Sequence, residues 1–129
     1  MTCSLRTILL AAAIVATTTA AAASTQKTWT GVMKSGDGKR TRVVATIDGD
    51  KASLRFAEPA NCVIAAGILD AEDDTTIYRF HVPRNGGPFC ARLYPGELFV
   101  TAPAGTSIRV MFRRQQVPWS GVLDRAVDP

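Results

Sequence analysis

The most direct candidate for chemistry in this chain is His81, its only histidine. An imidazole titrates near neutral pH, so it can serve as a general base or as a pH sensor. Alternation along the run TTIYRFHV places it on the same face as Arg79. Catalysis would also require a nucleophile and an orienting group, and the sequence holds no GxSxG, HExxH or SxxK motif. We therefore predict no catalytic residues and no enzymatic activity, with His81 as a half-exposed strand residue.

A second candidate is the acidic cluster of Asp70, Glu72, Asp73 and Asp74, whose oxygens could bind calcium. The cluster lacks the Asp-x-Asp-x-Asp-Gly order and the distal glutamate of an EF-hand loop. Adjacent carboxylates in a turn usually lie in solvent. The chain has no CxxC or Cys/His cluster that would suit zinc. We therefore predict no metal and no cofactor, and we expect Asp70 to Asp74 to form an acidic turn.

Arginines near the C-terminus are candidates for binding. If Ile108, Val110 and Phe112 point inward, Arg109 and Arg113 share the outer face of one strand, with Arg114 at its end. Such a face could dock an enzyme surface, an anionic glycan or a lipid head group. The alternative is a charged outer face that prevents aggregation at an edge, which is the more ordinary role of such arginines. Nucleic acid is not expected, because aromatic residues do not alternate with the basic ones.

The loop from Pro83 to Pro88 is a further candidate. It presents Arg84 and Asn85 on a glycine-rich tip, close to Cys90. A loop held in place by a disulfide loses less entropy when it binds an enzyme cleft. A plain connection between two strands is the alternative. The residues that we predict to bind a partner are therefore Arg84, Asn85, Arg109, Arg113 and Arg114, and the predicted partner is a protein or an anionic component of the cell envelope.

Residues 1–23 have the composition of a secretory signal peptide. Arg6 precedes the apolar run ILLAAAIVA, and small residues lead up to Ser24. Cleavage after Ala23 would leave one domain, residues 24–129, with a formal charge of +3, because Arg6 is the only charged residue removed. We expect a periplasmic or secreted protein without stable membrane insertion after cleavage. Cys62 and Cys90 then remain as an even pair, which predicts a disulfide.

The elements that must position these residues have the pattern of short β-strands. Runs of alternating polarity are separated by glycine, proline and aspartate. A helix over Val63 to Leu69 is disfavoured by Gly67 and by several β-branched residues. The predicted fold is all-β, a small antiparallel up-and-down β-barrel or β-sandwich of about eight strands. We expect strands near residues 29–34, 41–47, 51–56, 62–69, 75–82, 89–94, 98–101, 108–113 and 119–122.

Two similar strands lie at the two ends of the domain, Trp29-Thr30-Gly31-Val32 and Trp119-Ser120-Gly121-Val122. If they pair, the sheet closes into a barrel and both exposed edges disappear. A leader, a β-domain of this size and one disulfide resemble in outline the bacterial periplasmic inhibitors of lysozyme and the small lipocalin-like barrels. This resemblance is one of architecture, and no motif carries site residues over.

These observations favour an exported, non-enzymatic binding protein that recognises a macromolecule of the cell envelope or the extracellular space, with enzyme inhibition as one form of that activity. The alternative is a small lipocalin-like barrel that holds an apolar small molecule. Its lining would include Phe56, Phe80, Leu93 and Phe112, which are also natural core residues.

Overall fold

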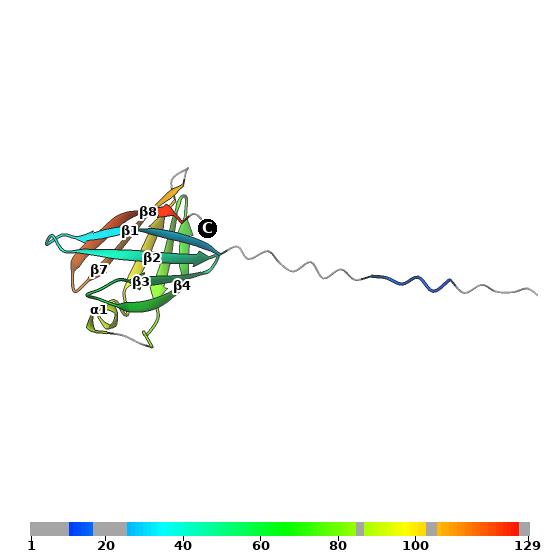
Figure 1. The fold of residues 1–129 in the computed structure, drawn as a ribbon, viewed down its shortest axis with the longest axis horizontal. Helices are drawn as coiled ribbons and strands as arrows, with labels where there is room; N and C mark the ends of the chain where they lie inside the picture. Colours follow the sequence, from blue (N-terminus) through cyan, green and yellow to red (C-terminus); the bar gives the residue numbers. More distant parts are fainter. Residues whose placement is uncertain (1–10, 17–25, 85–86, 103–105, 127–129) are drawn as a thin grey trace, which may run out of the picture.

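The computed structural model describes residues 11–16, 26–84, 87–102 and 106–126. These residues form an antiparallel β-sheet with one short helix (Figure 1). The sheet contains β1 (Lys27–Ser35), β2 (Arg40–Asp48), β3 (Lys51–Phe56), β4 (Cys62–Glu72), β5 (Thr75–Phe80), β6 (Glu97–Thr101), β7 (Ser107–Arg114) and β8 (Val117–Arg125), and α1 (Pro88–Ala91) lies between β5 and β6. Neighbours in sequence are neighbours in the sheet, and β1 also pairs with β8. The fold is therefore a closed barrel, which decides between the two predicted architectures.

The predicted leader lies mostly outside the described residues, as does its cleavage point after Ala23. Residues 11–16 are exposed and have no regular secondary structure. In the part of the chain that the structure describes, no helix has the length and apolar character needed to cross a bilayer.

Alternating strands fill the barrel with apolar side chains. In β3, Ala52, Leu54 and Phe56 are at most 4% exposed, whereas Lys51 and Arg55 are exposed. The same inward alternation was predicted for β2 and β7, and it is found in both. The sequence pattern thus identifies which residues face the core.

Two glycines allow β1 and β8 to close the barrel. Val32 lies opposite Val122, and Met33 lies opposite Gly121. A Cβ atom on Gly31 would lie 2.6 Å from the Val122 carbonyl oxygen, and one on Gly121 would lie 2.5 Å from that of Val32. Glycine is required where two backbones approach this closely. The predicted pairing of the two similar strands is confirmed, and the shared glycine is the residue that permits it.

The prediction of a strand over Phe89 to Tyr94 is wrong. Residues Pro88–Ala91 form α1, and a turn then leads to β6. Pro88 stands in the first turn of the helix, where a missing N–H costs nothing. The buried residues of this segment are Cys90 and Leu93, which are three positions apart, the spacing of a helical turn and not of a strand.

The prediction that Asp70 to Asp74 forms a turn is also wrong. β4 continues to Glu72, and only Asp73 and Asp74 connect it to β5. The register between β4 and β5 shifts between Ile68 and Asp70, as in a β-bulge. The extra residue of the bulge, Leu69, interrupts the period-two alternation of the sequence. The backbone pairing nevertheless resumes at Asp70, so the strand extends to Glu72.

The predicted disulfide is present between Cys62 and Cys90, whose Cα atoms are 6.1 Å apart. Cys62 is the first residue of β4, and Cys90 belongs to α1. The bond therefore does more than close the β4–β5 hairpin: it ties α1 to one end of the barrel. Both cysteines are buried.

Candidate functional site

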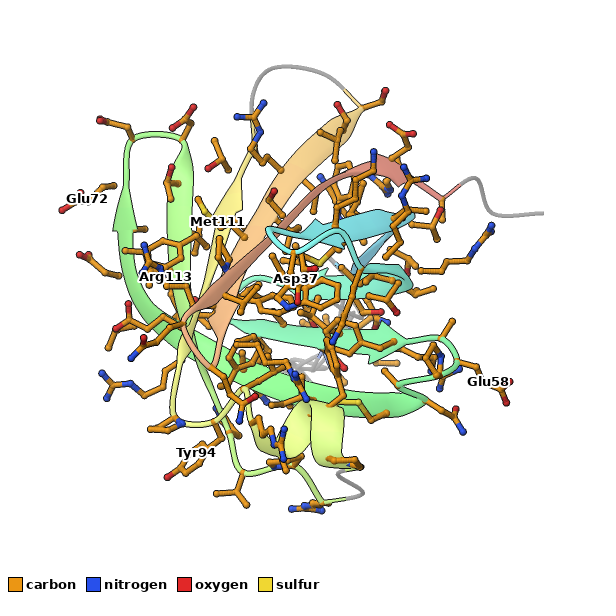
Figure 2. All side chains as sticks on the ribbon, turned by 90° about the vertical axis from the view of Figure 1, so that its left-hand side faces the viewer. Asp37, Glu58, Glu72, Tyr94, Met111 and Arg113 are labelled. Carbon is orange, nitrogen blue, oxygen red and sulfur yellow. A yellow bond between two sulfur atoms is a disulfide. The ribbon has the colours of Figure 1, made fainter. Side chains whose placement is uncertain are left out.

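The up-and-down topology sorts the connections into two ends of the barrel. The end that carries the β1–β2, β3–β4 and β7–β8 turns and α1 is here called the basic end, and Figure 2 looks onto it. Basic residues outnumber acidic ones there: Lys34, Lys39, Arg40, Arg84, Arg92, Arg113 and Arg114 against Asp37, Glu58 and Glu97. The opposite end, here called the acidic end, carries among the described residues seven acidic residues against four basic ones: Asp48, Asp50, Asp70, Glu72, Asp73, Asp74 and Asp124 against Lys27, Lys51, Arg109 and Arg125. The two ends thus differ in the sign of their potential.

A pocket of about 460 Å³ opens at the basic end. We call it the end pocket. Its lining combines cations with apolar and aromatic surface: Lys39, Arg40, Thr41, Pro59, Ala60, Pro88, Phe89, Arg114 and Trp119. Small-molecule sites of proteins have this size, and this mixture of an apolar wall with a few polar groups.

Aromatic packing holds the apolar wall in place. The ring of Phe89 meets that of Trp119 edge to face, with centroids 5.3 Å apart. On its other side Phe89 packs against Phe56, a core residue, at 4.8 Å. Since Phe89 adjoins Cys90, the disulfide and the core together fix the position of this wall.

Arg114 is the best-positioned cation of the end pocket. Its Nε donates to the Phe89 carbonyl oxygen at 3.2 Å, and its Nη2 donates to that of Pro88 at 3.4 Å. Its guanidinium lies 4.5 Å from the centroid of the Phe89 ring. A planar guanidinium has five N–H donors, so these two bonds orient it without exhausting it.

Among the described residues, no carboxylate forms an ion pair with Arg114. Two ion pairs occur within the described residues, Lys39–Asp37 and Arg79–Glu97, each at 4.0 Å. Partial burial, and next the charge of Arg92, lower the pKa of Arg114. Both effects disfavour its positive charge, and an anion in the pocket would offset them by favouring the charged form.

Asp37 is the acidic residue nearest in sequence to the pocket cations Lys39 and Arg40. Its carboxylate accepts a hydrogen bond from the Ser35 hydroxyl, and this bond is the main reason why its pKa is lowered. Asp37 therefore stays ionised and partly offsets Lys39. Both side chains of this pair are well exposed, so the offset is weak.

Thr41 contributes a polar group on the inner side of the end pocket. The residue is 6% exposed, and its Oγ1 has no hydrogen-bond partner among the described residues. A buried hydroxyl without a partner costs free energy. Unsatisfied buried groups are uncommon in folded proteins, so this hydroxyl is available to a ligand that reaches the inner side of the pocket.

The structure divides the predicted partner-binding residues among different surfaces. Arg114 alone lines the end pocket. Arg109 and Arg113 lie on the outer wall of β7, as predicted, and Figure 2 shows Arg113 and Met111 at the side of the barrel. Arg84 lines a separate hollow with His81. Asn85 lies outside the described residues.

Sequence reasoning missed four important residues of the end pocket, namely Lys39, Arg40, Phe89 and Trp119. They come from the β1–β2 turn and the start of β2, from α1 and from β8. No local pattern links these segments. They meet because β8 pairs with β1 and because the disulfide brings α1 to this end.

His81 lies in an exposed hollow whose described lining is Val63, Ala65, His81, Val82, Pro83 and Arg84. This lining contains neither a carboxylate nor a hydroxyl. A Cβ atom on Gly67 would lie 2.9 Å from the His81 Nε2, so the imidazole packs over that glycine. Among the described residues, no three side chains of His, Cys, Asp or Glu gather to hold a metal ion.

The residues expected to line an apolar-ligand site are packed together in the core. Phe56, Phe80, Leu93 and Phe112 are each at most 1% exposed. The ring of Phe112 contacts those of Phe56 and Phe80, with centroids 5.8 and 6.0 Å apart. An apolar pocket of about 380 Å³ lies instead at the acidic end. Its lining includes Trp29, Ile47, Tyr78, Val100 and Ile108.

Comparison of the chain with protein-family models, with curated proteins and with solved structures found no match.

Proposed function

We propose that this chain is an exported, non-enzymatic binding protein that recognises an acidic protein of the cell envelope or the extracellular space through its basic end. The observation that carries the proposal is Arg114, a cation fixed against an aromatic wall and without a carboxylate partner among the described residues. Inhibition of a partner enzyme is one activity that such binding would produce.

Charge and shape at the basic end support this proposal. An excess of Lys and Arg attracts an acidic surface and speeds its association. Lasting affinity needs a desolvated anchor at the centre of the interface, and arginine, here Arg114, is one of the residue types that most often supply one. The half-buried Phe89 provides apolar surface beside it, packed against the buried Trp119. The disulfide restrains the wall before binding, which lowers the entropy lost on association.

A capture experiment tests the proposal. Mature, disulfide-bonded protein is immobilised and exposed to an extract of envelope and extracellular proteins. The same is done with a basic-end variant carrying Lys39→Gln, Arg40→Gln and Arg114→Gln. We expect the wild-type protein to retain an acidic protein and the variant to retain at least tenfold less.

A matched variant separates site-specific binding from net charge. Lys27→Gln, Lys51→Gln and Arg109→Gln remove the same number of cations from the opposite end of the barrel, away from the end pocket. This variant should capture the partner as well as the wild type does. Equal losses in both variants, or no loss in either, would contradict a site at the basic end.

Export is tested by the N-terminus of the protein after expression from its full-length gene. We expect the mature mass to begin at Ser24, with material recovered outside the cytoplasm and no free thiols at Cys62 and Cys90. Unprocessed protein that stays in the cytoplasm with both thiols free would contradict the exported assignment.

The apolar pocket at the acidic end supports a second candidate function, the binding of an apolar small molecule. Trp29 lines this pocket, so its fluorescence should respond to a ligand there. In a Trp119→Phe background, a long-chain alcohol would quench or shift the emission of Trp29 with a saturable dependence on concentration. A linear response would exclude a site.

A further inference from the structure

The lining of the end pocket points to a particular chemical group on the partner. We propose that the end pocket binds a carboxylate that stands next to an apolar side chain in a peptide segment of the partner. Arg114 pairs with the carboxylate, and Phe89 and Trp119 form the surface for the apolar side chain. This inference rests on the proposed function, because the peptide segment is the part of the acidic protein that enters the pocket.

The geometry of Arg114 favours a carboxylate. Its Nε and Nη2 are engaged with the carbonyl oxygens of Phe89 and Pro88, which leaves Nη1 and one Nη2 hydrogen free to donate. The edge of a guanidinium matches the two oxygens of a carboxylate and donates two parallel hydrogen bonds to them. The contact with the Phe89 ring restricts the orientation of the guanidinium plane. The donor set is thus oriented before the ligand arrives.

The rest of the lining calls for an apolar group beside the anion. Pro59, Ala60, Pro88, Phe89 and Trp119 supply hydrocarbon surface, and the pocket volume of about 460 Å³ is far more than one carboxylate needs. A bare anion would leave this surface in contact with water. An apolar side chain attached near the carboxylate removes it from water and adds hydrophobic free energy.

The lining favours a peptide over an anionic glycan. A sugar ring presents several hydroxyls that need donors and acceptors on the protein. Among the described residues of the lining, Thr41 is the one polar side chain apart from the cations, and its hydroxyl is buried. A peptide side chain such as phenylalanine needs no such partners. Lys39 and Arg40 at the opening can meet a second acidic residue of the same segment.

A titration of the mature, disulfide-bonded protein tests the inference. The probe is the capped peptide acetyl-Gly-Asp-Glu-Phe-Gly-amide, and binding is followed by the amide resonances of the protein. We expect saturable binding. Replacement of both acidic residues by their amides should weaken it at least tenfold, and replacement of Phe by Ser should weaken it at least fivefold.

Arg113 provides the matched control, since it neighbours Arg114 in sequence but faces the outer wall. Arg113→Gln should leave the dissociation constant within twofold. Arg114→Gln should raise it at least tenfold, and Arg114→Lys, which keeps the charge but loses the planar fork, should raise it at least threefold. Because Arg114 also donates hydrogen bonds to α1, the unfolding curve of each variant is recorded as a control for folding. Arg40→Gln removes a pocket cation that forms no hydrogen bond to α1 among the described residues, and it should raise the dissociation constant at least twofold.

Several results would overturn the inference. They are equal binding of the acidic and amide peptides, equal losses in the Arg113 and Arg114 variants, or tighter binding of a galacturonic acid oligosaccharide than of the peptide. Failure of the peptide together with capture that depends on the basic end would overturn the inference alone. Peptide binding combined with capture that ignores the basic end would instead overturn the proposed function.

Discussion

At the scale of single residues, buried polar groups differ in whether their hydrogen-bonding capacity is satisfied. The Tyr78 hydroxyl donates to the Gly49 carbonyl oxygen at 3.1 Å, whereas Thr41 Oγ1 has no partner among the described residues. Arg114 lies between these cases, with two backbone partners but no balancing charge. The one buried side-chain group without a partner among the described residues, the Thr41 hydroxyl, lies at the basic end, in the lining of the end pocket.

Replacement of Thr41 by valine should stabilise the free protein. The change keeps the shape and the β-branching of the side chain. It removes a hydroxyl that has lost its hydrogen bonds to water without gaining a partner among the described residues. We expect the free energy of unfolding to rise by about 1 kcal/mol, measured by urea denaturation. Thr30→Val, on the exposed face of β1, is the control and should change it by less than about 0.5 kcal/mol. A loss of stability in the Thr41 variant would show that its hydroxyl has a partner.

Tyr78 should make the protein less stable at alkaline pH. Burial, and secondarily Asp50, raise the pKa of Tyr78 above its ordinary value of 10.0. Between the unfolded and folded pKa values the native state binds more protons than the unfolded state. Stability is therefore complete below pH of about 10 and falls as the pH rises further.

Phenylalanine variants at the two tyrosines test this expectation. Tyr78→Phe should lose about 1 kcal/mol at pH 7 with its hydrogen bond, and its stability should decline less steeply above pH 10 than that of the wild type. Tyr94→Phe alters the exposed tyrosine and should keep the wild-type slope. Stability curves of wild type and Tyr78→Phe that run parallel above pH 10 would contradict the assignment.

At the scale of elements, the turns of the basic end carry conformational cost. Gln115 and Gln116 connect β7 to β8, and both have positive φ, 51° and 67°. This is the conformation of a type I′ turn, which usually carries Asn-Gly. Gln115 also accepts a hydrogen bond from Arg92. The residues of this turn therefore suit its side-chain contacts better than they suit its backbone conformation.

Gln116→Gly should relieve the cost at the second turn position. We expect a gain of about 0.5–1 kcal/mol in the free energy of unfolding, because glycine adopts positive φ without a Cβ clash. Thermal unfolding monitored by circular dichroism gives the measurement. Gln115→Gly loses the bond to Arg92 and should gain less. A destabilised Gln116→Gly variant would show that the side chain of Gln116 contributes contacts worth more than the backbone cost.

The sequence predicts elements better than it predicts the site, for physical reasons. The alternation of apolar and polar residues predicted β2, β3 and β7 correctly, because the side chains of a strand alternate between its two faces whatever the strand pairs with. It failed at Phe89 to Tyr94, where a helix and a turn bury residues three positions apart, Cys90 and Leu93. It also failed at Asp70, where a β-bulge shifts the register. Arg114 was anticipated as a binding residue. Its neighbours Lys39 and Trp119 were not, because only the closure of β1 onto β8 brings them together.

At the scale of the whole molecule, one disulfide connects stability to the binding surface. The bond between Cys62 and Cys90 spans 28 residues and holds α1, which carries Phe89, against the barrel. In the chain-entropy account, closure of a loop of this length contributes about 3.5 kcal/mol. The end pocket should therefore be more sensitive to reduction than the acidic end.

Cys62→Ala with Cys90→Ala should lower the free energy of unfolding by about 3.5 kcal/mol. It should also weaken binding at the end pocket, because Phe89 and the carbonyl partners of Arg114 lose their tether. Urea denaturation and peptide titration measure the two effects. Amide exchange should increase first in α1 and at the start of β4. An unchanged affinity in the folded variant would show that the core contacts of Phe89 suffice to hold the wall.

The polarity of the barrel, basic at one end and acidic at the other, leads to the central claim that an acidic partner meets the basic end. Amide chemical-shift mapping of the mature protein with the Asp-Glu-Phe peptide tests this claim most directly. The account predicts shifts at Lys39 to Thr41, at Phe89 and from Arg114 to Trp119, with the turn from Asp48 to Lys51 unchanged. Shifts confined to the acidic end, or spread along the outer wall of β7, would contradict it.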